Sequence, residues 1–75
     1  MSLYAALSSA GVPTDHHASD LYAKVTPESQ PLVRAACERG EVTGVTTFTS
    51  QIDGERWYDI PFAYVPWWEE KQATG

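Results

Sequence analysis

Residues 45–60, VTTFTSQIDGERWYDI, decide the fold of this 75-residue chain. The first half of the stretch is rich in β-branched residues, which are typical of strands. Asp53–Gly54 then gives a strong signal for a tight turn, and alternating residues follow it. The stretch therefore predicts an antiparallel β-hairpin.

The register of this hairpin follows from its apolar residues. A three-residue loop over 52–54 would place Phe48 opposite Tyr58, with Ile60 on the same face. This register gathers the apolar side chains on one side, so it is the one that we expect. The opposite face would then carry Trp57, Thr47, Thr49 and Asp59.

Upstream of the hairpin, the pattern predicts a helix over 2–10 and a strand over 21–25. Ser2 is a suitable N-cap for the helix, and Gly11 a suitable residue just beyond its end. The strand LYAKV alternates, with Leu21, Ala23 and Val25 on one side and Tyr22 and Lys24 on the other. Residues 12–20 read as a loop because Pro, Thr, Asp and Ser cluster there.

A second helix is predicted between Thr26 and Gly40. Thr26 followed by Pro27 is a typical helix start, and Pro31 leaves Ser29 open as an alternative start. The stripe expected to be buried consists of Leu32, Val33, Ala36 and Cys37.

These elements predict one α+β domain over residues 1–75, in the order α-β-α-β-β. A C-terminal aromatic arm, PFAYVPWW at 61–68, and a frayed tail at 69–75 follow the hairpin. A chain this short buries only about 60% of the surface of its unfolded state, so its core must be small.

Charge and composition limit the classes of function that we expect for this chain. The chain carries ten acidic and five basic residues, a net charge of −5, which disfavours binding to nucleic-acid phosphates and suits a basic protein partner. Cys37 is the only cysteine, so neither an internal disulfide nor a cysteine zinc site is expected. No leader and no apolar run of about 18 residues is seen, so we expect a soluble, cytoplasmic protein.

The stretch 13–22, PTDHHASDLY, is a candidate metal site. Adjacent side chains on an extended chain point to opposite sides, so His16 and His17 do not converge on one ion. His17 and Asp20 would converge if the chain turned between them. The turn-forming residues Asp15 and Asp20 instead favour an ordinary connection, and we predict no bound metal or cofactor.

Catalytic groups are not evident. Cys37 could pair with a histidine as a nucleophile, but its place on an apolar stripe predicts a small buried residue. Asp53 and Glu55 lie at a hairpin tip, where exposure to solvent does not give carboxylates the special environment that general acid–base catalysis needs. We therefore expect a protein without enzymatic activity.

Aromatic residues concentrate near the C-terminus. Tyr58 and Phe62 are the best candidates for the core, whereas adjacent Trp67 and Trp68 would point to opposite faces of an extended segment. An exposed Trp beside acidic residues is typical of an interface anchor. The predicted partner-binding residues are Trp57, Tyr64, Trp67, Trp68, Glu69 and Glu70.

Two stretches, SLYAALSSAGVPTDHHASDLYAKVTPES (2–29) and FTSQIDGERWYDIPFAYVPWWE (48–69), resemble short accessory proteins of bacteriophages and prophages. The resemblance implies a small acidic protein that binds and modulates a host protein, such as a component of defence or transcription, as anti-CRISPR proteins do. It also implies location in the host cytoplasm.

Two other functions stay open. A single-strand nucleic-acid binder could use Trp57, Trp67 and Trp68 as stacking platforms, but only Arg56 and Lys71 lie near them in sequence. A small metal-binding or structural protein could be built on His16 and His17.

Overall fold

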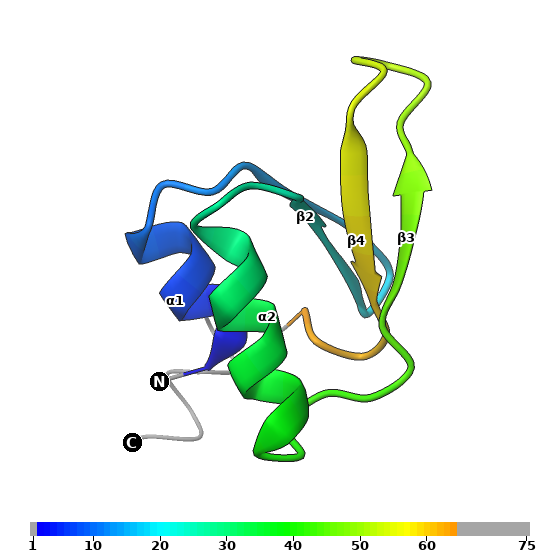
Figure 1. The fold of residues 1–75 in the computed structure, drawn as a ribbon. Helices are drawn as coiled ribbons and strands as arrows, with labels where there is room; N and C mark the ends of the chain where they lie inside the picture. Colours follow the sequence, from blue (N-terminus) through cyan, green and yellow to red (C-terminus); the bar gives the residue numbers. More distant parts are fainter. Residues whose placement is uncertain (1, 65–75) are drawn as a thin grey trace.

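Two short helices pack on one face of a four-stranded antiparallel sheet (Figure 1). The computed structural model describes residues 2–64. The elements, in chain order, are α1 (Leu3–Ser9), β1 (Thr14–His17), β2 (Asp20–Lys24), α2 (Ser29–Glu38), β3 (Thr46–Thr49) and β4 (Arg56–Ile60). The strands lie in the order β1-β2-β4-β3, so β1 and β3 form the edges of the sheet. The predicted α+β class is confirmed.

The core lies between the helices and the two central strands. Alternate residues of β2, Leu21 and Ala23, are fully buried, and Ile60 of β4 joins them. From the helical side the buried residues are Leu3, Leu7, Val33 and Ala36, with Val12 and Val42 from the connections. Tyr58 packs against this core, as predicted.

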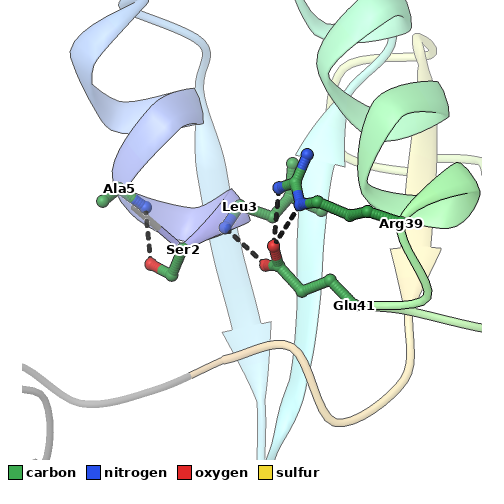
Figure 2. Close-up of polar contacts among 5 residues, drawn as sticks. All are labelled: Ser2, Leu3, Ala5, Arg39 and Glu41. Atoms are coloured by element: carbon green, nitrogen blue, oxygen red, sulfur yellow. Dashed lines mark hydrogen bonds and ion pairs between the residues drawn. The ribbon is translucent and has the colours of Figure 1, made fainter.

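Helix α1 is held at its first turn by groups near and far in the sequence (Figure 2). The Ser2 hydroxyl accepts a hydrogen bond from the Ala5 amide at 3.2 Å, which confirms the predicted N-cap. The Leu3 amide donates to Glu41 Oε2 at 2.6 Å, and Arg39 Nε donates to the other oxygen of the same carboxylate at 2.9 Å. Glu41 thus ties the chain beyond α2 to the start of α1.

The pKa of Glu41 reflects these contacts. Partial burial alone would raise this pKa, but the hydrogen bonds from Leu3 and Arg39 and the Arg39 charge together lower it below its usual 4.5. The carboxylate is therefore stabilised in its ionised form.

Helix α2 is joined to β2 through the buried hydroxyl of Ser29. This hydroxyl donates to the Lys24 carbonyl at 2.7 Å and accepts from the Thr26 amide at 2.8 Å. The Thr26 hydroxyl in turn accepts from the Ser29 amide, so Thr26 caps the turn as predicted although the regular helix begins at Ser29.

The predicted order omitted one strand. Residues 14–17, expected to be loop, form β1 and pair antiparallel with β2 through a two-residue connection, Ala18–Ser19. Ala18 has a φ of 54°, and a positive φ at the first loop residue is typical of a type II′ hairpin turn. The prediction failed because TDHH is polar throughout, and an edge strand with no buried side chain leaves no apolar alternation to detect.

The predicted register of the second hairpin is wrong by one residue. Phe48 lies opposite Trp57, and Thr47 lies opposite Tyr58. The loop has four residues, 51–54, closed by a hydrogen bond from the Gly54 amide to the Ser50 carbonyl at 2.9 Å. Tyr58 and Ile60 still face the core, but Phe48 lies on the other face with Trp57.

Two further predictions of burial are wrong. Cys37 is exposed, because α2 turns Val33 and Ala36 inward instead. Phe62 is 85% exposed and has a φ of 57°, since the chain turns directly after β4. The second half of the predicted aromatic arm, residues 65–68, and the predicted tail, 69–75, lie outside the described residues. Neither helix within residues 2–64 has the length and apolar character to cross a membrane.

Candidate functional site

The face of the sheet opposite the helices is an uncovered surface within residues 2–64 (Figure 1). Strand pairing sets its side chains in rows across the sheet. Tyr22 lies opposite Asp59, and Asp59 lies opposite Thr46. In the next row Lys24 lies opposite Trp57, which faces Phe48. Since Leu21 and Ala23 point into the core, these neighbours point away from it. We call this surface the open face.

Three half-buried aromatic side chains gather on the open face. The rings of Tyr22 and Phe48 meet edge to face, with centroids 5.2 Å apart, and Phe48 lies opposite Trp57. They line a cleft of about 350 Å³ between the sheet and the tip of the second hairpin. The complete lining consists of Thr14, Asp15, Tyr22, Phe48, Ser50, Ile52, Asp53 and Trp57.

Asp53 is fixed at one side of the cleft by the hairpin loop. Its carboxylate accepts hydrogen bonds from the Glu55 amide at 2.9 Å and from Trp57 Nε1 at 3.2 Å. The backbone hydrogen bond from Glu55 is the main cause that lowers the pKa of Asp53, and the Trp57 hydrogen bond and the Lys24 charge act in the same direction. The cleft therefore holds an oriented, ionised carboxylate beside an indole ring.

Acidic groups concentrate on this face. Strand alternation and the cleft lining place four carboxylates there, those of Asp15, Asp20, Asp53 and Asp59. Lys24 is the basic residue on the same face of the described chain. The other charged residues described are nearly balanced: Glu28, Glu38, Glu41 and Glu55 against Arg34, Arg39 and Arg56. The excess negative charge of residues 2–64 thus lies mainly on the open face.

Asp59 has one oxygen without a partner. Its Oδ1 is buried and receives no hydrogen bond from residues 2–64. A buried carboxylate oxygen without a hydrogen-bond donor is energetically unfavourable.

The predicted site residues are dispersed. Trp57 lines the cleft. Tyr64 lies elsewhere: its ring meets Tyr4 edge to face and stacks on His16. The remaining predicted residues, Trp67, Trp68, Glu69 and Glu70, lie outside the described residues.

Sequence reasoning missed Tyr22, Phe48 and Asp15 as site residues. The sequence did indicate the position of Tyr22, because the alternation in LYAKV places it on the side of the strand away from Leu21 and Ala23. Phe48 was missed because the register was wrong, and Asp15 because β1 was read as a loop.

The two histidines face opposite sides of β1. His16 stacks on Tyr64 at a centroid distance of 3.8 Å, whereas His17 lies directly opposite Asp20 in the hairpin. The turn that would bring His17 and Asp20 together is therefore present. Among residues 2–64, however, no group of three or more His, Cys, Asp or Glu side chains could hold a metal ion.

Comparisons with known proteins find no matching family model, curated protein or solved structure. The likeness to phage accessory proteins therefore stays a prediction from the sequence.

Proposed function

We propose that this protein is a non-catalytic binding module whose open face docks on a basic surface of a partner protein. The observation that carries the proposal is the coincidence of three aromatic rings, a cleft and four carboxylates on the uncovered side of the sheet. A few residues supply most of the binding energy at protein interfaces, and Trp and Tyr are enriched among them. Acidic groups around them speed association with a basic partner and favour it over others.

The charge of the open face favours a protein partner over a nucleic acid. Trp57 could stack on a base, but such binding also needs basic groups that follow the phosphates. Lys24 is outnumbered there by carboxylates, which repel phosphates. The nucleic-acid function is therefore the weaker proposal.

The biological setting of the proposal comes from the sequence. A phage-encoded protein of this size and charge would act by occupying a surface of a host protein, for example a component of defence or transcription. In this proposal Trp57 belongs to the main contact, and Tyr64 forms a separate one. The other predicted binding residues, Trp67, Trp68, Glu69 and Glu70, lie outside the described residues.

The proposal predicts that Trp57→Ala abolishes partner capture. The tagged protein is incubated with a lysate of the bacterial host, and captured proteins are quantified by mass spectrometry. Phe62→Ala is the matched control, because it removes an exposed aromatic ring that does not line the cleft. We expect one or more proteins to be retained by the wild type and by Phe62→Ala, and lost with Trp57→Ala.

Folding must be separated from binding in this experiment. Trp57→Ala also removes the hydrogen bond to Asp53, so circular dichroism must show a folded variant. Asp53→Asn keeps an acceptor for the Glu55 amide but loses the charge, and it should weaken capture of the same proteins. If folded Trp57→Ala and Asp53→Asn both retain those proteins at the wild-type level, the open face is not the binding surface.

A further inference from the structure

We infer that the cleft on the open face receives an arginine side chain of the partner. The inference rests on the proposed function and specifies the chemistry that the cleft recognises. It follows from three features of the cleft: its planar aromatic walls, its two oriented carboxylates, and the single cation that the described part of the chain places near it.

The walls of the cleft suit a flat cation. Tyr22, Phe48 and Trp57 line it together, and all three are half-buried and so partly accessible. A guanidinium group stacks on aromatic faces and is attracted by their negative charge distribution. Because it is more weakly hydrated than an ammonium group, it also loses less on leaving water.

The carboxylates of the cleft are oriented before any ligand arrives. Asp53 is held by the Glu55 amide and the Trp57 indole. Asp15 accepts a hydrogen bond from the amide of His16 at 2.8 Å. An ionised carboxylate has about four acceptor sites, so each of the two groups keeps free capacity for the N–H donors of arginine.

Among residues 2–64, Lys24 is the one cation near the cleft, and it leaves room for a second. Lys24 lies opposite Trp57, and its charge acts on Asp53. A single ammonium group does not balance Asp15 and Asp53 together. We therefore expect Lys24 to compete with the incoming arginine, and its removal to strengthen arginine binding.

The test is a titration of the full chain, labelled with nitrogen-15, with blocked amino acids. N-acetyl-arginine amide should shift the Trp57 indole signal and the amide signals of Tyr22 and Phe48 in a saturable way. N-acetyl-citrulline amide has nearly the same shape without the charge, and it should bind at least about 10-fold more weakly. N-acetyl-lysine amide, which lacks the planar fork, should also bind more weakly than arginine.

Variants connect the binding to the named groups. Asp53→Asn should weaken arginine binding by about 5-fold, and Lys24→Met should strengthen it by about 2-fold. The control Glu38→Gln, an exposed acid on α2, should leave it unchanged. The inference is overturned if citrulline or lysine binds as well as arginine, if the shifts lie away from the cleft, or if Asp53→Asn binds like the wild type.

The two proposals fail in different ways. If arginine does not enter the cleft but Trp57→Ala still loses the captured partner, the arginine inference alone is wrong. If folded Trp57→Ala and Asp53→Asn keep the captured partner, the proposed function is wrong, whatever the titration shows.

Discussion

At the scale of single residues, Glu41 links two segments that are far apart in the sequence, the start of α1 and the chain just after α2. Its carboxylate accepts a hydrogen bond from the Leu3 amide at the start of α1 and another from the Arg39 side chain just after α2. The first amides of a helix have no partner within the helix, so a carboxylate placed there satisfies one of them. No pattern in the sequence predicts this contact, because its partners are 38 residues apart.

Glu41→Ala is expected to destabilise the fold by about 1 kcal/mol, as the loss of a helix-capping acceptor does. The free energy of unfolding would be measured by urea denaturation. Glu38→Ala is the matched control, since Glu38 is an exposed acid at the end of α2, and it should change stability by less than about 0.5 kcal/mol. Equal effects of the two substitutions would show that the contact between Glu41 and Leu3 contributes nothing.

The same contact predicts a pH dependence. The pKa of Glu41 is lower in the folded state than its usual 4.5, so its contribution to stability is complete above that usual value. The contribution falls as pH drops below about 4.5 and through the lower folded pKa. The stability difference between wild type and Glu41→Ala should therefore shrink between neutral pH and strongly acidic pH. A difference that stays constant or grows on acidification would contradict the lowered pKa.

At the scale of elements, local signals predicted the helices and the second hairpin but not the edge strand β1. Ser2 and Thr26 cap their turns as expected because capping depends on residues three positions apart. The strand β1 forms because it pairs with β2, and its polar residues show no alternating pattern that would predict this pairing. The register of the second hairpin depends on its loop, and the sequence allowed both a three-residue and a four-residue loop.

The candidate site was predictable only in part for the same reason. Trp57 was identified because it lies on the face away from Tyr58 and Ile60 in both the predicted and the observed register. The cleft around it requires Phe48 opposite Trp57 and Tyr22 within reach of Phe48, and both contacts follow from strand order and register. Those are properties of the assembled sheet rather than of any short stretch of the chain.

The hairpin loop gives a test at this scale. Gly54 has a φ of 70° and closes the loop onto Ser50, with open space where a side chain would begin. Gly54→Val should destabilise by roughly 1–3 kcal/mol through backbone strain, because β-branched residues avoid this conformation. Gly54→Asn should be far milder, since Asn tolerates it. Thermal unfolding that is identical for Gly54→Val and the parent would refute the loop conformation.

At the scale of the whole molecule, the two faces of the sheet differ in burial and in the kind of side chain they carry. One face, with Leu21, Ala23 and Ile60, is buried under the helices and provides the core. The other face carries aromatic rings and carboxylates that the fold does not need to bury. Half-buried aromatic side chains on the face away from the core are consistent with the proposal that a partner covers them.

The measurement that tests this account most directly is photo-cross-linking from each face. A photoreactive benzoylphenylalanine is incorporated at Thr46, an exposed position on the open face, and separately at Arg34, an exposed position on α2. Each protein is irradiated in a lysate of the bacterial host. We predict a specific cross-linked partner from position 46 and none from position 34, with the position 46 product lost when Trp57→Ala is added. A partner cross-linked from position 34 alone, or equally from both positions, would contradict binding through the open face.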